Sequence, residues 1–341
     1  MSKKNIFILL GLVASLVLAA VIWYQISLGF RSRNTKVEAF SIVAGQNTAT
    51  ILNNLEEKNI ISSVLAAKIY LYRHKGIKIQ AGEYNIEPNT STRQLFADLG
   101  LGKTVSREIS LLFREGLSLK EMQAELNKNG YLTNGEFFRL GQTKIKDLPV
   151  RLKISPFLKE VSATATLEGF LFPDTYRVYK DFSAEDLAAK MLDNFDHKLT
   201  PQIRQDIRSS GHSFEDIVIM ASILQKEVRT EKEMKLASGV FWNRLRAGQA
   251  LQSCATLAYI LGENKAQYSY ADTQIDSPYN TYQHPGLPPG PVSNPGLMAL
   301  NAAIHPENSD YNYFLSRPDT GETIFSRTLE EHNAAKAKYL K

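Results

Sequence analysis

The residue of this sequence best placed for acid–base chemistry is Glu227, in the stretch SFEDIVIMASILQKEVR at 213–229. Apolar side chains recur there at helical spacing, and Glu227 follows two of them by three and four positions. It therefore lies beside the apolar stripe, where loss of water raises the pKa of a carboxyl group and lets it act as a general acid. A boundary glutamate paired with Arg229 or Lys232 fits the same spacing, and both interpretations stay open.

Two further acids, Glu168 and Asp174, flank the turn at Pro173 within TLEGFLFPDTYRVY. A carboxyl group among aromatic rings is a common arrangement in sugar-binding sites. Asp174 could equally cap the turn that it follows, because aspartate side chains hydrogen-bond to nearby backbone groups. The sequence leaves both roles open.

The stretch SPYNTYQHPGLPPGPVSNPG, residues 277–296, holds six of the thirteen prolines and three glycines. Proline lacks an amide donor and has a fixed φ, so this stretch predicts a long irregular loop. Tyr279, Asn280 and Tyr282 place hydrogen-bonding groups and flat apolar faces on a stiffened backbone, which loses little entropy when it grips a ligand. Such a surface suits a glycan; a structural brace packed on the helices is the alternative, and the two roles are compatible.

Other kinds of chemistry have no motif in this chain. The six histidines form no HExxH motif, and Cys254 is the only cysteine, which predicts neither a metal site nor an intrachain disulfide. No GxSxG, GxxxxGK or GxGxxG segment occurs, so neither a serine nucleophile nor a nucleotide cofactor is expected. We therefore expect no metal and no cofactor.

The composition is that of a folded protein with more than one domain. Apolar residues make up 43% and charged residues 22% of the 341 residues. The net charge of +5 is spread without a basic run, which argues against nucleic-acid binding.

An uncharged apolar run from Ile6 to Ile26 opens the chain. A helix of this length spans the hydrocarbon core of a membrane, and Trp23 and Tyr24 fall near its far end, where such rings favour the interface. The run is longer than the core of a typical signal peptide, which favours a retained anchor over a cleaved signal. We expect the bulk of the chain to be translocated.

The remaining periodicities predict an α+β protein. Residues 36–104 read as a small β-αα-β unit, with a strand in VEAFSIV, two short strands in IKIQAGEYNI and a last helix closed by Gly100. Further helices are expected at 118–129, 183–198, 200–209, 213–229, 231–246 and around Cys254, after a strand in VSREISLLF.

Five segments together resemble one family, and they occur in the family's order. They are LEGFLFPDTY, ASILQKE, VFWNRL, SPYNTYQHPGLPPGPVSNPG and FSRTLEEHN. With the anchor and the AGEY turn, they make nearly the whole chain similar to the membrane-anchored endolytic murein transglycosylases called MltG or YceG-like. The resemblance implies a cytoplasmic tip and transmembrane anchor at 1–30, a LysM-like subdomain at 36–104 and a YceG-like catalytic domain at 105–341.

The resemblance also implies a reaction. Such an enzyme cleaves the MurNAc–GlcNAc bond of peptidoglycan without water, leaves 1,6-anhydroMurNAc ends, and acts as a terminase of nascent strand elongation. Glu227 matches the second glutamate of the family's ASI-x-EKE motif, the catalytic acid and base, and no cofactor is needed. The implied place is the inner (cytoplasmic) membrane, with an extracytoplasmic catalytic domain and penicillin-binding synthases as suggested partners. The implied substrate-binding residues are Glu168, Asp174, Gln252, Tyr279, Asn280 and Tyr282.

Two positions depart from the family pattern. Gln225 replaces the first glutamate of the ASI-x-EKE motif, and Cys254 stands in LQSCAT where aspartate is usual. Two alternatives follow: a non-catalytic peptidoglycan-binding scaffold of the elongation machinery, and a hydrolytic muramidase that uses Glu227 together with Glu168 or Asp174.

Overall fold

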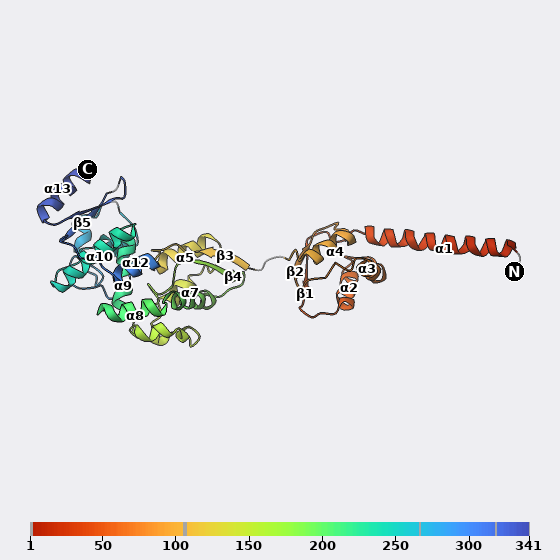
Figure 1. The fold of residues 1–341 in the computed structure, drawn as a ribbon, viewed down its shortest axis with the longest axis horizontal. Coiled ribbons are helices and arrows are strands. Elements are labelled where there is room, and N and C mark those ends of the chain that lie inside the picture. The colour runs from red at the N-terminus through yellow and green to blue at the C-terminus, as the bar shows by residue number, and fades with distance from the viewer. Residues whose placement is uncertain (1–2, 105–107, 266, 318, 341) are drawn as a thin grey trace. The chain divides into compact units, whose positions relative to one another are not determined.

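The computed structural model describes residues 3–104, 108–265, 267–317 and 319–340, and the chain forms two compact units, residues 1–107 and 108–341 (Figure 1). Each unit has its own apolar core. Within the described residues, helices are combined with three antiparallel pairs of short strands. The mixture of helices and strands predicted from the sequence is confirmed.

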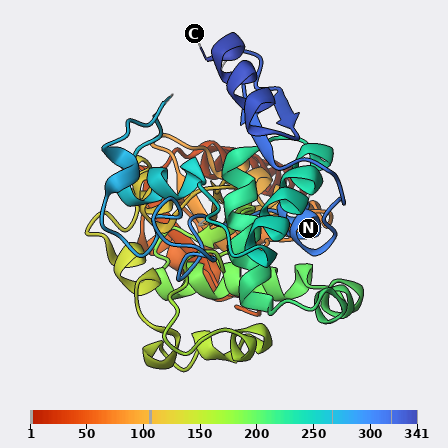
Figure 2. The same ribbon diagram turned by 90° about the vertical axis from the view of Figure 1, so that its left-hand side faces the viewer.

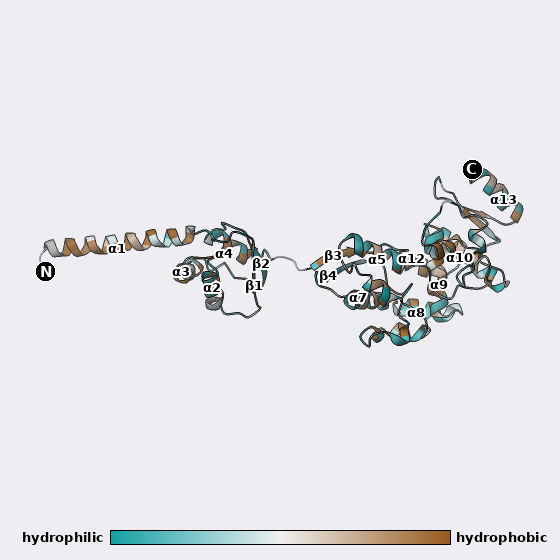
Figure 3. Cartoon of the chain, turned by 180° about the vertical axis from the view of Figure 1, so that it is seen from behind, coloured by the Kyte–Doolittle hydropathy of each residue, from teal (hydrophilic) through white to brown (hydrophobic). Residues whose placement is uncertain are grey.

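The apolar run at the N-terminus forms helix α1, Lys3–Gly29. Over Ile6–Gly29 it is long and apolar enough to cross a membrane, and none of this stretch's most apolar window is buried by the rest of the chain (Figure 3). The end of α1 differs, because Leu28 is only 2% exposed and the helix contacts α3 and α4 there. The next segment also packs on the first unit, since the carbonyl of Phe30 accepts a hydrogen bond from the Thr92 amide at 3.1 Å.

The first unit follows the predicted β-αα-β order, with one further helix. Its elements are β1 (Glu38–Ile42), α2 (Thr48–Glu57), α3 (Val64–Arg73), β2 (Gly82–Ile86) and α4 (Thr92–Leu101). β1 and β2 pair antiparallel, with Phe40 opposite Tyr84 and both rings in the core.

Two expectations for the first unit were wrong in detail. IKIQAGEYNI supplies one strand and not two, because residues 77–81 form no strand. The last helix ends at Gly102 and not at Gly100, since Gly102 is the residue that adopts the left-handed conformation (φ 64°) and closes the helix by hydrogen bonds to Asp98 and Leu99.

The second unit is mainly helical. Its elements are β3 (Glu108–Leu112), α5 (Leu119–Lys128), α6 (Glu136–Gly141), short 3-10 turns at Ile145–Asp147, Leu152–Ile154, Pro156–Glu160 and Asp272–Gln274, β4 (Thr175–Tyr179), α7 (Ala184–Lys198), α8 (Pro201–Ser210), α9 (Phe214–Glu227), α10 (Glu231–Arg246), α11 (Cys254–Leu261), α12 (Leu297–Ile304), β5 (Tyr313–Ser316), β6 (Thr323–Ser326) and α13 (Leu329–Tyr339). β3 pairs with β4, and the expected start of its strand, residues 105–107, lies outside the described residues.

Helix α9 is the central element of the second unit. Ser213 and Asp216 form a reciprocal capping box at its start, so aspartate takes the place usually held by glutamate or glutamine. Phe214 joins an aromatic cluster with Phe157, Phe170 and Phe195. Helices α10, α11 and α12 contact α9 along its length, which fixes the position of its C-terminal end.

The C-terminal elements β5, β6 and α13 contact one another and stand together at one end of the second unit (Figure 2). They reach α9 through Ser316, whose hydroxyl donates a hydrogen bond to the backbone carbonyl of Glu227 at 3.0 Å. Residues 275–296 form neither helix nor strand in the structure.

Candidate active site

Glu227 is the last residue of α9, and its side chain does not extend into bulk solvent. Most residues of the helix from Phe214 to Leu224 are buried, and Glu227 itself is partly buried. The chain leaves the helix in an extended conformation at Val228. The packed helix therefore holds one carboxyl group at a fixed place on the edge of the core.

The Glu227 carboxyl group lies at the N-terminus of α11. The Ser253 hydroxyl and the Ala255 backbone amide both donate hydrogen bonds to Oε1, the second at 3.0 Å. Ser253 is also the N-cap of α11, where backbone amides are unpaired and the helix dipole is positive. The site is thus built where the ends of two helices meet.

Burial raises the pKa of Glu227. Hydrogen bonds from Ser253, Ala255 and Cys254, and the nearby charge of Arg244, act in the opposite direction but are smaller. The carboxyl group therefore keeps its proton to a higher pH than a free glutamate, while donors are already in place for the anion. A single group with both properties can give up a proton and then take one back.

Three side chains complete the surroundings of Glu227. Cys254 is exposed, and its Sγ lies 3.3 Å from the Tyr282 hydroxyl. Arg244 of α10 donates to the Leu251 carbonyl at 2.6 Å and lies over the ring of Tyr313. Sequence reasoning missed Arg244 and Ser253; the arginine within the apolar VFWNRL segment and the serine before α11 were the available signals.

Gln252 lies beside the site but is exposed. The φ angle of Gln252, 53°, is in the left-handed region, which costs a non-glycine residue about 1 kcal/mol or more. The backbone amide of Gln252 donates a hydrogen bond to the Thr281 carbonyl at 3.0 Å. The backbone amide of Ser253 donates one to the Thr281 hydroxyl at 3.1 Å. The proline-rich loop therefore holds the start of α11 in place.

Asn280 lies inside the proline-rich loop. It is fully buried, and its amide donates to the carbonyls of Thr273 and Ile275 at 3.1 and 2.8 Å, while its Oδ1 accepts from the Tyr282 amide at 3.0 Å. In this structure the side chain braces the loop, and its expected contact with substrate stays a prediction. The brace places Tyr282 next to Cys254.

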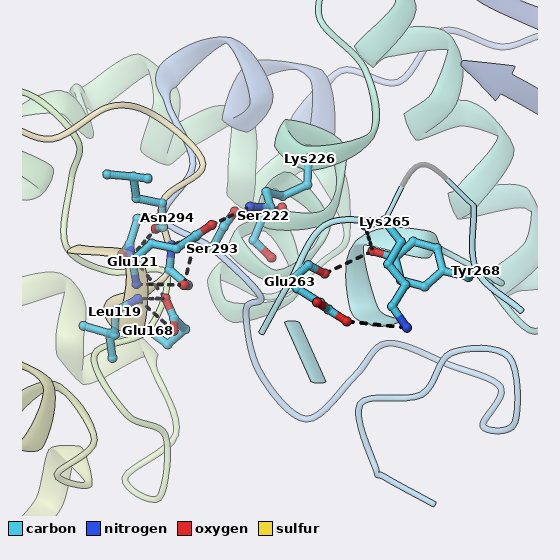
Figure 4. A network of polar contacts seen from close by, with 12 residues as sticks. Leu119, Glu121, Glu168, Ser222, Lys226, Glu263, Lys265, Tyr268, Ser293 and Asn294 are labelled. Carbon is cyan, nitrogen blue, oxygen red and sulfur yellow. Dashed lines mark hydrogen bonds and ion pairs between the residues drawn. The ribbon is translucent and has the colours of Figure 1, made fainter. Parts of the chain in front are cut away.

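Glu168 forms a second buried acidic centre, 2% exposed (Figure 4). Its oxygens accept hydrogen bonds from the Leu119 amide and from Nδ2 of Asn294, all at 3.1 Å. Burial nevertheless raises its pKa to about 8. Gly169, with φ 86°, lets the loop approach, because a Cβ there would lie 2.3 Å from Pro291.

Glu168 lines a cavity of about 410 Å³ together with Tyr259 and Tyr279. The two tyrosine rings contact each other at 5.0 Å between centroids. Glu227 is not among the lining residues, although Lys226 is. Tyr279 therefore lines the cavity together with Glu168, whereas Tyr282 contacts Cys254 next to the Glu227 site.

Asp174 is placed elsewhere in the second unit. Its carboxylate accepts from the Thr175 amide at 2.8 Å and from Asn194 at 3.1 Å, and it lies 3.4 Å from Lys198. These contacts hold its pKa below the ordinary value. None of these partners contacts Glu227 or lines the cavity, so the turn-capping role left open by the sequence is the one that the structure supports.

The described part of the chain contains no group of three or more His, Cys, Asp or Glu side chains arranged to hold a metal ion.

Comparison with known proteins gives one consistent family. The sequence matches the YceG-like family over residues 40–338. An endolytic murein transglycosylase of Bacillus subtilis strain 168 is 30% identical over 308 residues, which cover 88% of this chain and 84% of the Bacillus chain. An endolytic murein transglycosylase of Streptococcus pneumoniae is 28% identical over 329 residues, or 91% of this chain but only 59% of the longer streptococcal chain.

A solved structure is similar as well. The crystal structure of a YceG-like protein from Listeria monocytogenes aligns with 89% of this chain and with the whole of the Listeria chain. The TM-score is 0.60 at 32% sequence identity.

Proposed function

Because this chain belongs to the YceG-like family, we propose that it is an endolytic murein transglycosylase in which Glu227 is the catalytic acid and base. The observation that carries the assignment of Glu227 is its partly buried carboxyl group, which accepts hydrogen bonds from Ser253 and Ala255 and whose pKa is raised by burial. The substrate is peptidoglycan, whose glycan strands the enzyme cleaves internally.

The reaction uses the one carboxyl group twice. Protonated Glu227 first gives its proton to the oxygen that joins MurNAc to GlcNAc, and the bond from that oxygen to the anomeric carbon breaks. The resulting carboxylate then accepts the proton of the muramoyl C6 hydroxyl as this oxygen bonds to the anomeric carbon. The products are a free GlcNAc hydroxyl and a 1,6-anhydro ring, and Glu227 is protonated again.

Ser253 is proposed as the residue that positions Glu227. Replacing it with alanine removes the donor to Oε1 and the N-cap of α11, and we expect kcat/KM to fall about tenfold. Because Ser253 favours the carboxylate, its loss should also move the basic limb of the pH–rate profile to higher pH. Ser253→Thr keeps the hydroxyl and should restore both values; an unchanged pH profile in Ser253→Ala would contradict this role.

Digestion of purified glycan strands by the full-length protein in detergent tests the reaction. Mass spectrometry should find 1,6-anhydro ends. Ends heavier by one water molecule would instead identify a muramidase, with Glu168 as the candidate second carboxyl. Intact strands that the protein still binds would identify the non-catalytic scaffold.

The first unit is proposed to be LysM-like and to bind the same glycan. The β1–α2 turn and the segment before β2 form a groove of about 370 Å³, whose lining includes Val43, Gln46, Thr48, Leu71, Ile77, Lys78, Ile79 and Ala81. The three-part division at 1–30, 36–104 and 105–341 is part of this proposal. Weaker retention of a Gln46→Ala variant on peptidoglycan would support it.

We also propose that α1 anchors the protein in the cytoplasmic membrane, with its N-terminus in the cytoplasm and the folded parts of both units that follow α1 outside. Protease added to intact spheroplasts should then degrade both units. Penicillin-binding synthases remain the partners suggested by the family resemblance, and crosslinking in cells would test them.

A further inference from the structure

The cavity at Glu168 is lined by that buried acid, by apolar side chains and by four further charged residues, which we call its charged rim. Lys120, Glu121, Lys226 and Glu263 are the charged residues that line it besides Glu168. Lys226 Nζ lies 3.4 Å from Glu121 Oε1 (Figure 4). Lys120 is exposed at the start of α5. At about 410 Å³ the cavity is large enough for a small ligand.

This cavity shares two helices with the Glu227 site. Lys226 precedes Glu227 in α9, and Tyr259 follows Ala255 by four residues in α11. One turn of helix advances roughly 5 Å along its axis, so Tyr259 faces the cavity about one turn from the amide that binds the Glu227 carboxyl group. A substituent on a sugar bound at Glu227 has only a short way to reach the cavity.

The charges of the rim indicate which class of ligand the cavity binds. A neutral sugar is usually held by open aromatic faces and uncharged hydrogen-bonding groups. Here the two tyrosine rings pack against each other. In the rim, Lys226 pairs with Glu121 and Glu263 pairs with Lys265, while Lys120 adds an exposed cation. Such a rim complements a ligand that carries a carboxylate.

We propose that this cavity binds the peptide substituent of the muramoyl residue, and so makes the enzyme prefer glycan strands that carry stem peptides. The inference rests on the proposed function, because the muramoyl residue is the sugar on which Glu227 acts. The stem peptide has free carboxylates and an amine, and it leaves the glycan from the sugar ring next to the cleaved bond. Lys120 is placed to meet a peptide carboxylate.

The experiment compares two substrates that differ only in the peptide. Full-length wild type, Lys120→Glu and Lys120→Ala are given peptide-bearing strands and the same strands after amidase has removed the peptides. We expect Lys120→Glu to lower kcat/KM about tenfold on the peptide-bearing strands and to leave the bare strands unchanged. On the peptide-bearing strands, the kcat/KM of Lys120→Ala should lie between that of Lys120→Glu and that of wild type.

Lys128→Glu is the matched control, since Lys128 is an exposed lysine of the same helix and does not line the cavity. It should match wild type on both substrates. An acidic residue at position 120 is also favourable in the first turn of α5, so folding should be kept; thermal unfolding checks this. Equal losses of Lys120→Glu on both substrates, or no loss on either, would overturn the inference.

A binding measurement separates this inference from the reaction itself. Calorimetric titration of the Glu227→Gln variant with a soluble muramoyl peptide should give an affinity that Lys120→Glu weakens about tenfold. If wild type cleaves no strand but this difference is found, the proposed reaction fails and the peptide site stands. If strands are cleaved but the muramoyl peptide does not bind, the peptide site fails alone.

Discussion

Glu227→Gln is expected to lower the rate of glycan cleavage by about 100-fold or more, while the protein stays folded. The amide has the shape of the carboxylic acid and can still accept hydrogen bonds from Ser253 and Ala255 at its oxygen. It can neither give a proton to the glycosidic oxygen nor take one from the C6 hydroxyl. Counting 1,6-anhydro ends over time measures the loss.

The matched control for this variant is Glu231→Gln. Glu231 is exposed at the start of α10, four residues further along the chain, and pairs only with Lys235 on the surface among the described contacts. Glu231→Gln should leave the cleavage rate unchanged, because this exposed side chain makes no described contact with Glu227. It should also leave the fold intact, because exposed ion pairs contribute little to stability. A Glu227→Gln variant as active as this control would remove Glu227 from the mechanism and with it the transglycosylase proposal.

Glu168 is expected to make the second unit less stable as the pH rises from about 5 to 8. Its pKa is raised to about 8 in the folded protein from an ordinary value of 4.5. In that window the unfolded chain releases the proton and the folded chain keeps it, so a rising pH favours unfolding. Each pKa unit corresponds to about 1.4 kcal/mol, and the change is therefore on the order of 4 kcal/mol.

Glu168→Gln should remove this dependence, because the amide stays neutral and is close in shape. The measured quantity is the difference in free energy of unfolding between variant and wild type at several pH values. His332 titrates in part of the same window, since burial lowers its pKa to about 4, but it contributes equally to both proteins and cancels. Emission of Trp242, buried in the second unit, follows the transition. A difference that does not change with pH would contradict the raised pKa.

Much of the local structure could be predicted from the sequence. Helix α9 begins at the Ser213 cap, and its apolar spacing placed Glu227 at the edge of the core, where the structure has it. The helix α1 and the irregular loop at 277–296 could also be predicted from local patterns of the sequence. Caps, helical periods and prolines act through residues only a few positions apart, so a short stretch of sequence is sufficient to reveal them.

The partners and depth of each site residue were decided by tertiary packing. Glu227 meets Ser253 and Ala255 across 26 and 28 positions, and Glu168 meets Asn294 across 126. Asn280 and Asp174 were expected among the substrate-binding residues; packing buries the first within the loop, and the second accepts a hydrogen bond from the Thr175 amide.

The sequence by itself determined that this protein carries an apolar helix long enough to span a membrane and a glutamate at the boundary of a helix, because both are patterns of neighbouring residues. Only the tertiary structure decided that the carboxyl group of this glutamate lies at the start of α11. It also decided that Tyr279 lines the cavity at Glu168 and that Tyr282 contacts Cys254. Burial and hydrogen-bond partners depend on which distant segments pack together, and no local pattern records that choice.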